Sequence, residues 1–122
     1  MRVGRFEAGI DGLTVPYARP QESGHRSDLR SITLRSGGSD WLRLDAEADV
    51  EGRLPGFVLA RHTGQELDAA GHPHELPEPS HTHLFLDAAQ NGVGSRACGP
   101  SVWADHMLKP EARTLRFRIT AL

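Results

Sequence analysis

Residues 29–45 read LRSITLR-SGGSD-WLRLD and contain the pattern that decides the fold class. Polar and apolar residues alternate in Leu29–Arg35 and again in Trp41–Asp45, on either side of the glycine-rich Ser36–Asp40. Alternation with a period of two is typical of a β-strand, and adjacent glycines between two such runs are typical of a hairpin turn. Both faces of the first run are mixed, so the pattern does not say which face is buried. We predict an antiparallel hairpin here.

Further strands and one helix are predicted on the C-terminal side of this hairpin. Phe57–Ala60 follows Pro55-Gly56 as a short apolar run, and Thr82–Asp87 is a second strand-like run. Between them, Thr63–Gly71 has the features of a short helix: Thr63 can cap its start, Glu66 can complete a capping box, and the final glycine can end it.

The clearest strand pattern lies near the end of the sequence, in Thr114–Thr120. Its apolar residues are predicted to face inward, and they are Leu115, Phe117 and Ile119. Strands recur every 10 to 15 residues with turn residues between them, and there is no internal repeat. We therefore expect an all-β protein, an antiparallel β-sandwich with one short helix, in which residues 1–122 form a single domain.

Composition excludes several classes of function. Charged residues make up 25% and apolar residues 38% of the 122, with a formal net charge of -2, so neither disorder nor a nucleic-acid or anionic-membrane surface is expected. No apolar run approaches the roughly 20 residues of a membrane-spanning helix. A single cysteine excludes an internal disulfide. We expect a cytoplasmic protein.

The glycine-rich stretch Asn91–Val102 is the first candidate ligand site. It follows a predicted strand and contains three glycines, the only cysteine and a Gly-Pro step. Glycines allow positive φ and close approach of another surface, and such loops often hold ligands. The spacing is too sparse for a nucleotide-binding loop. Cys98 could act as a nucleophile only beside an activating histidine, which the spacing does not identify, so a small buried residue is the favoured interpretation.

Two His-x-His pairs, His72/His74 and His81/His83, are candidate metal ligands. On a strand, His81 and His83 would point to the same side, as two ligands of one metal should. The alternative is that most of these histidines are simply exposed in a Pro-rich loop, and we expect no metal site.

Carboxylates and tryptophans give a weaker signal. Glycosidase chemistry requires two carboxylates held about 5 to 10 Å apart. Nothing in the spacing selects a pair from the candidates, which are Glu22, Asp40, Asp45, Asp87 and Asp105. Trp41 and Trp103 could each stack on a sugar ring, although a Trp on a short strand is more often part of the core.

Two sets of motifs resemble those of a known family. Near the N-terminus, Val15–Arg30 contains Pro-Tyr, then PQESG, then an Arg-x-Asp-x-Arg tail. Further along, Leu86-Asp87 is followed by GVG and by Cys98-Gly99-Pro100. Together these resemble the last third of the C-terminal domain of bacterial β-galactosidases of glycoside hydrolase family two, from about residue 2 to residue 120. Ser23 replaces the usual Asn of the first motif.

The resemblance implies a fold and a site. The C-terminal domain of the family is an antiparallel supersandwich similar to the galactose mutarotase fold, and it closes one side of the sugar pocket against a catalytic barrel. A Trp of the closing motif contacts the sugar in these relatives, and Cys98 occupies the corresponding position. The expected wall of the galactoside pocket therefore comprises Asn91, Arg96, Cys98 and Gly99.

The resemblance also implies what this chain lacks. The two catalytic glutamates of the family lie in the barrel, so we expect a fragment with no catalytic residue and no cofactor of its own, while Mg or Na serves other domains. Strand edges left open in a fragment favour self-association. Two alternatives stay open: a free-standing carbohydrate-binding sandwich that uses Trp41 or Trp103, and a small metal-dependent β-barrel enzyme built on the His-x-His pairs.

Overall fold

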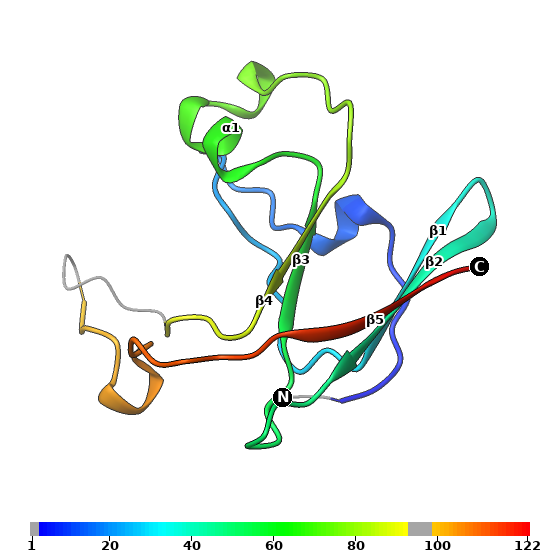
Figure 1. Cartoon of the computed structure of the whole chain (residues 1–122). Helices are drawn as coiled ribbons and strands as arrows, with labels where there is room; N and C mark the ends of the chain where they lie inside the picture. Colours follow the sequence, from blue (N-terminus) through cyan, green and yellow to red (C-terminus); the bar gives the residue numbers. More distant parts are fainter. Residues whose placement is uncertain (1–2, 93–98) are drawn as a thin grey trace. The chain divides into compact units, whose positions relative to one another are not determined.

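The computed structural model describes residues 3–92 and 99–122 (Figure 1). Its described part contains strands β1 (Ser31–Ser36), β2 (Ser39–Glu47), β3 (Gly56–Ala60), β4 (His83–Asp87) and β5 (Arg116–Ala121), with one α-helix, α1 (Gly64–Ala69). Three 3₁₀ turns complete it: η1 (Ile10–Leu13), η2 (Pro73–Glu75) and η3 (Ala104–His106). The all-β prediction with one short helix is confirmed.

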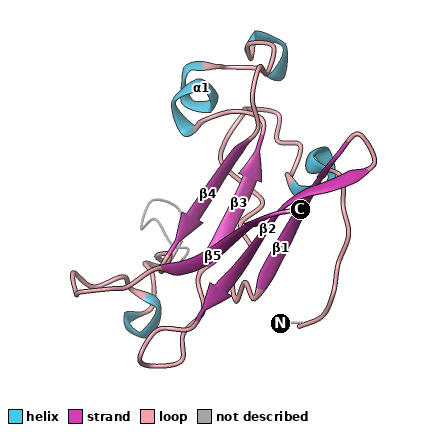
Figure 2. Ribbon diagram, turned by 45° about the vertical axis from the view of Figure 1, so that its right-hand side comes forward, coloured by secondary structure: helices cyan, strands magenta, loops and turns pink. Residues whose placement is uncertain are grey.

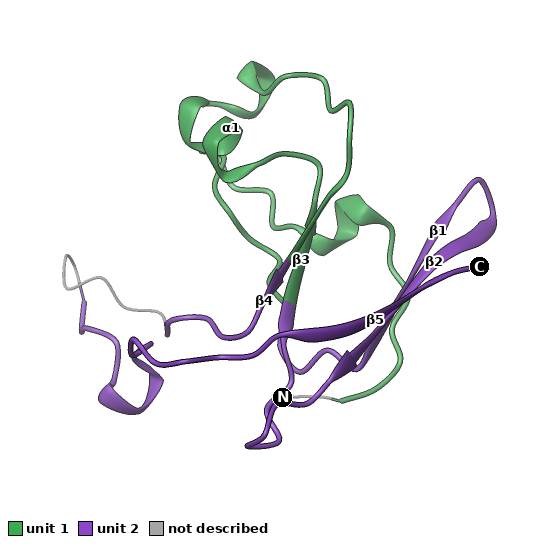
Figure 3. Ribbon diagram, in the orientation of Figure 1, with its two compact units in different colours: residues 1–26, 57–85 green, residues 27–56, 86–122 purple. Residues whose placement is uncertain are grey.

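The strands form two sheets (Figure 2). One sheet has the order β1-β2-β5 with antiparallel pairs, and the other pairs β3 with β4, which run in opposite directions. The chain divides into two compact units, residues 1–26 with 57–85 and residues 27–56 with 86–122 (Figure 3). The second unit contains the three-stranded sheet and both described flanks of the glycine-rich loop.

The predicted hairpin is the β1–β2 pair. Gly37 and Gly38 have φ of +59° and +83°, which suits a two-residue turn with positive φ at both positions. Leu34 pairs with Leu42 while Arg35 pairs with Asp40, so Trp41 is the extra residue of a β-bulge. The hairpin prediction is confirmed, and the bulge adds a kink that the alternation alone does not reveal.

Apart from Trp41 in the bulge, the register places the apolar side chains of the three-stranded sheet on one face. The rows of this apolar sheet face are Leu34–Leu42–Ala121, Ile32–Leu44–Ile119 and Ala46–Phe117. Burial on this face depends on the position of the strand in the sheet. Leu44 on the central strand is 2% exposed, whereas Ile119 on the edge strand β5 is 65% exposed. The prediction that Leu115, Phe117 and Ile119 all face a core is wrong for Leu115 and Ile119, which are exposed; Phe117 alone is half-buried.

The first unit is organised around β3 and α1. Thr63 caps the helix: its Oγ1 accepts from the Glu66 amide at 3.3 Å, and Glu66 Oε2 accepts from the Thr63 amide at 2.7 Å. This capping box is as predicted. The helix ends at Ala69 with Ala70 extended, so Gly71 does not supply the left-handed cap expected of it.

The PQESG motif forms a close chain crossing within the first unit. Gly24 has φ of +82°, and a Cβ there would lie 2.3 Å from the Leu13 carbonyl oxygen. Ser23 Oγ accepts a hydrogen bond from the Val15 amide at 3.1 Å. Arg26 exchanges two backbone hydrogen bonds of 2.9 Å with Phe57 on β3. Val15–Pro20 is a connection outside any strand, in agreement with its two prolines.

Candidate functional site

The described part of the glycine-rich stretch and its surroundings comprises residues 88–92 and 99–113, which we call the loop-flank segment. Two consecutive residues, Asn91 and Gly92, hold this segment together through hydrogen bonds. The Gly92 amide donates to the His106 carbonyl at 2.8 Å, and Asn91 Oδ1 accepts from the Leu108 amide at 2.8 Å. These two bonds join residues 91–92 to the last residue of η3 and to Leu108, two positions further on.

Gly92 is required here because of close packing. A Cβ at this position would lie 2.8 Å from His106 Cβ and 2.9 Å from Val102 Cγ1, which is closer than carbon atoms can approach. Val102 is buried, so it cannot move aside into solvent. Close approach of another surface, one of the two roles that the sequence allowed for the glycines, is the role of Gly92.

Two open depressions meet at Gly92 and His106. One of about 300 Å³ is lined also by Gln90, Asp105, Leu108 and Arg113 among others. The second, of about 280 Å³, is lined also by residues 100–103. Their amide, carboxylate, imidazole and guanidinium groups can hydrogen-bond to hydroxyl groups. Asp105 is the only described carboxylate at either depression, so neither offers the pair that glycoside hydrolysis requires.

Trp103 gives the segment an exposed aromatic surface. Its ring stacks on His106, with centroids 6.3 Å apart and planes inclined by 19°, while the residue remains 72% exposed. Trp41, the other sequence candidate, lies in the β2 bulge and is 49% exposed. Of the two tryptophans, Trp103 lines one of these two depressions and Trp41 lines neither.

A chain of ion pairs ties the C-terminal end of the segment to the turn after β2. Arg113 Nη2 lies 2.5 Å from Glu111 Oε1, and the same oxygen lies 3.8 Å from Arg53 Nη1. Arg53 in turn contacts Asp49 at 2.8 Å and Glu51 at 2.6 Å. Hydrogen bonds from the Arg53 side chain and amide hold the pKa of Asp49 below its usual value. Arg113 Nε is buried and has no hydrogen-bond partner among the described residues.

Comparison with known sequences identifies the family. The profile of the family described as "Beta galactosidase small chain" matches residues 1–120. The chain belongs to the β-galactosidase small-chain family.

Named relatives agree with this assignment. The chain is 57% identical over 119 residues to a β-galactosidase of Arthrobacter sp. (strain B7), covering 98% of this chain and 12% of that protein. It is 36% identical over 92 residues to a β-galactosidase of Vibrio cholerae and 30% identical over 101 residues to that of Streptococcus thermophilus. These matches cover 75% and 83% of this chain, and 8% and 9% of the two relatives. The small-chain sequence thus spans about one eighth or less of these relatives.

The structure describes two of the four predicted pocket-wall residues. Cys98 and Arg96 lie outside the described residues. Asn91 and Gly99 are described: the Asn91 side chain bonds the Leu108 amide and the Gly92 carbonyl, and a Cβ on Gly99 would meet no atom of the described residues within 4 Å. Asn91 therefore holds the chain at the base of the loop. Sequence reasoning missed His106, and no local pattern marks it as the partner of Gly92.

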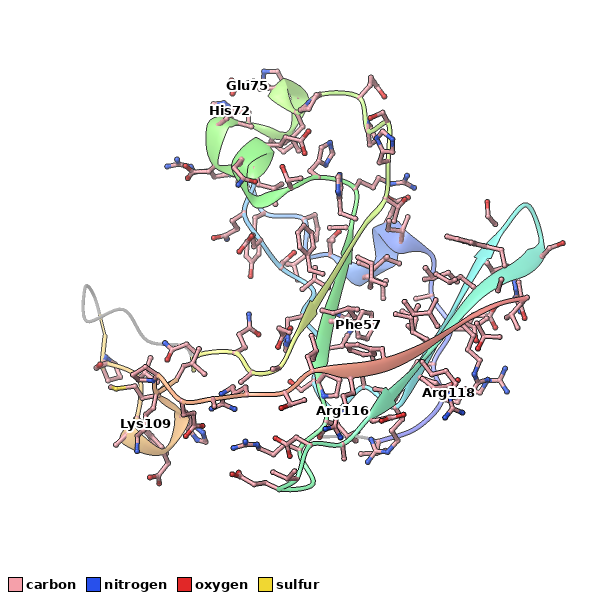
Figure 4. All side chains as sticks on the ribbon, viewed as in Figure 1. Phe57, His72, Glu75, Lys109, Arg116 and Arg118 are labelled. Carbon is pink, nitrogen blue, oxygen red and sulfur yellow. The ribbon has the colours of Figure 1, made fainter. Side chains whose placement is uncertain are left out.

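The histidine pairs lie in the first unit. His72 and His74 stack with centroids 5.5 Å apart, and His72 Nδ1 lies 3.3 Å from Glu75 Oε1, next to it in Figure 4. Because β4 begins at His83, His81 lies outside the strand, where its Nδ1 is 2.8 Å from Ser80 Oγ. Within residues 3–92 and 99–122, no three His, Cys, Asp or Glu side chains are grouped as metal ligands.

A helix that spans a membrane must be both long and apolar. None of the helices in the described residues is long and apolar enough to cross a membrane.

Proposed function

We propose that this small chain is part of the C-terminal sandwich domain of a glycoside hydrolase family two β-galactosidase, with residues 1–122 as one truncated domain. The longer enzyme hydrolyses terminal β-D-galactosides such as lactose by a retaining double displacement between two carboxylates. The 57% identity to a β-galactosidase across 98% of this chain carries the proposal. The single carboxylate at the two depressions supports a role as pocket wall, with the reaction in the catalytic barrel.

In this proposal the glycine-rich loop forms one wall of the galactoside pocket. Asn91 and Gly99 bound the loop, and Arg96 and Cys98 lie within it. A cysteine offers no flat ring for a sugar to stack on, so its contact is weaker than that of the Trp implied at this position by the resemblance. Gly92 and His106 fix where the loop leaves the domain.

The remaining expectations complete the proposal. This part of the enzyme carries no cofactor, while Mg or Na serves other domains, and the enzyme is cytoplasmic. Its partners are the catalytic barrel and the galactoside. The isolated chain self-associates through open strand edges.

Assay of the purified 122-residue chain with a chromogenic galactoside tests whether the catalytic residues lie in another part of the enzyme. We expect no turnover above the buffer rate. Turnover that disappears on Asp105→Asn would overturn the assignment of the chemistry to another part of the enzyme.

The role as pocket wall is tested in the longer enzyme that contains this chain. Gly92→Ala forces the loop base apart, so we expect a several-fold higher KM for the galactoside. Gly9→Ala is the control, because a Cβ there would meet no described atom within 4 Å and Gly9 lies outside the proposed pocket wall. An equal KM in both variants would contradict a pocket-wall role for this loop.

The exposed face of Trp103 favours a second candidate function, a non-catalytic carbohydrate-binding sandwich. Trp41 and Trp103 are the only tryptophans, so Trp41→Ala and Trp103→Ala leave one fluorophore each. Titration of the isolated chain with galactose or lactose decides: a saturable fluorescence change in the millimolar range that persists in Trp41→Ala and is lost in Trp103→Ala would favour this function. No change with either sugar would eliminate it.

A further inference from the structure

The outer edge of β5 is an open side of the three-stranded sheet. Among the described residues no strand pairs with it, because β5 is last in the order β1-β2-β5. The apolar sheet face continues onto this strand, where Ile119 is 65% exposed. An exposed edge with an apolar face is a template for another strand.

The register shows which backbone groups are free on this edge. The Leu122 amide donates to the Trp41 carbonyl at 3.0 Å, so Trp41 and Leu122 form a hydrogen-bonded pair. Hydrogen-bonded and non-hydrogen-bonded pairs alternate in antiparallel sheets. Arg116, Arg118 and Thr120 therefore bond β2, while the N–H and C=O groups of Phe117, Ile119 and Ala121 point outward.

The side chains define the chemistry that this edge accepts. Arg116 and Arg118 share the polar face of β5 (Figure 4), opposite Glu47 and Asp45 of β2. Neither arginine lies within ion-pair distance of a carboxylate among the described residues. The contacts of 2.7 to 3.0 Å to Asp45 come from Arg43, and Arg118 acts on Asp45 only through its charge, which helps to lower the pKa of that carboxyl. A strand added outside β5 would face both arginines in non-hydrogen-bonded pairs, where side chains approach most closely.

We propose that the outer edge of β5 receives an antiparallel strand of alternating apolar and acidic residues, contributed by the remainder of a longer β-galactosidase polypeptide. Acidic side chains would face Arg116 and Arg118, and apolar ones would cover Phe117 and Ile119. Within this chain β2 has such a pattern, but β1 and β5 occupy both of its edges. A second copy of β5 would bring the same two arginines and no acid. The proposal rests on the chain being part of a larger enzyme, since its relatives are about eight times longer or more.

Two synthetic peptides test the chemistry of the edge on the isolated chain. One is a blocked heptapeptide of alternating valine and glutamate, and the control alternates valine and lysine. We expect the acidic peptide to bind about tenfold more tightly at low salt, with a smaller difference at high salt. Hydrogen exchange should slow at the amides of Phe117, Ile119 and Ala121 and stay unchanged at Arg118. Equal affinity for both peptides would overturn the proposal.

Variants locate the binding edge. Ile119→Pro removes an outward N–H and leaves the β2 ladder intact, so it should abolish peptide binding. Arg116→Gln with Arg118→Gln should remove the preference for the acidic peptide, whereas Arg5→Gln with Arg19→Gln removes the same charge from exposed positions outside the sheet and should not. Unchanged preference in the β5 pair would contradict the proposal even if the proline variant fails to fold.

The same sample separates this inference from the proposed function. If copies of the chain pair through β5, light scattering shows a dimer, and the acidic peptide should convert it to monomer. A β5-paired dimer that resists the peptide would overturn the proposal. Neither readout depends on galactosidase activity, so the assignment to the longer enzyme stands or falls on its own assays.

Discussion

The β1–β2 hairpin and the loop-flank segment belong to the same compact unit, yet they are held in different ways. Six residue pairs, interrupted by one bulge at Trp41, fix the hairpin, and the fully buried Leu44 anchors its centre. The loop-flank segment has only short 3₁₀ structure and relies on a few particular contacts, above all those of Asn91 and Gly92. The hairpin carries the stability of the sheet, while the segment carries the geometry of the candidate site.

Leu44→Ala should give the largest effect and is the strongest way to break the hairpin. Removal of a fully buried leucine side chain leaves a cavity, and we expect the free energy of unfolding to fall by about 2 to 5 kcal/mol. Urea unfolding followed by circular dichroism measures it. Leu122→Ala, at an exposed position, is the control. A similar loss in both variants would show that the apolar sheet face is not the core of this unit.

Gly92→Ala should give the next largest effect, and it should be confined to the loop-flank segment. Its Cβ would overlap His106 and Val102, at a cost of about 1 to 3 kcal/mol typical of overpacking. Hydrogen exchange at the Leu108 amide reports the loss. Gly99→Ala should leave this exchange unchanged, and equally fast exchange in the two variants would contradict the packing argument.

Asn91→Ala should weaken the same segment less. It removes the acceptor of the Leu108 amide, an exposed bond that contributes about 1 kcal/mol. Exchange at Leu108 should accelerate, while the hairpin amides, such as that of Leu44, keep their protection. Parallel acceleration in both places would mean that hairpin and segment open as one unit, which contradicts the distinction drawn between them.

Lowering the pH should change the free energy of unfolding least, and the change should come from the hairpin. The hydrogen bond from Arg43 holds the pKa of Asp45 below the ordinary 3.8. Because the folded-state pKa is depressed, this stabilisation is fully present above pH 3.8 and is lost as the pH falls through the lower folded value. Urea unfolding between about pH 2 and pH 5 should show a shallower pH dependence in Asp45→Asn than in the wild type.

The control for this measurement is Asp105→Asn, which removes the same charge from a carboxylate outside any ion pair of the described residues. If both variants flatten the profile equally, the loss reflects net charge and the pair with Arg43 is not its source.

Local signals in the sequence predicted the regular elements. Gly37 and Gly38 marked the hairpin turn, and Thr63 with Glu66 marked the helix start, because each of these residues acts on backbone groups only a few positions away. The sequence motifs also pointed to the β-galactosidases, and the family match over residues 1–120 confirms membership of the small-chain family.

Long-range placement could not be predicted in the same way. Alternation in Thr114–Thr120 shows which side of the strand is apolar, but only the sheet order shows that β5 is an edge and that Ile119 is exposed. Likewise, nothing near Gly92 in sequence indicates that it packs on His106, 14 positions later (106 − 92). The pocket-wall roles of Cys98 and Arg96 stay predictions, because both residues lie outside the described part of the chain.

The bonds of Asn91 and Gly92 have a consequence for how this enzyme family can diversify. They join the chain at residues 91–92 to residues 106–108, so these two described flanks are tied together by contacts in which residues 93–98 take no part. The entropy of closing a loop rises only slowly with its length. We therefore expect residues 93–98 to accept insertions, deletions and grafted sequences while the sheet stays folded. Under the proposed pocket-wall role, such changes would alter which galactosides bind while the sheet stays intact.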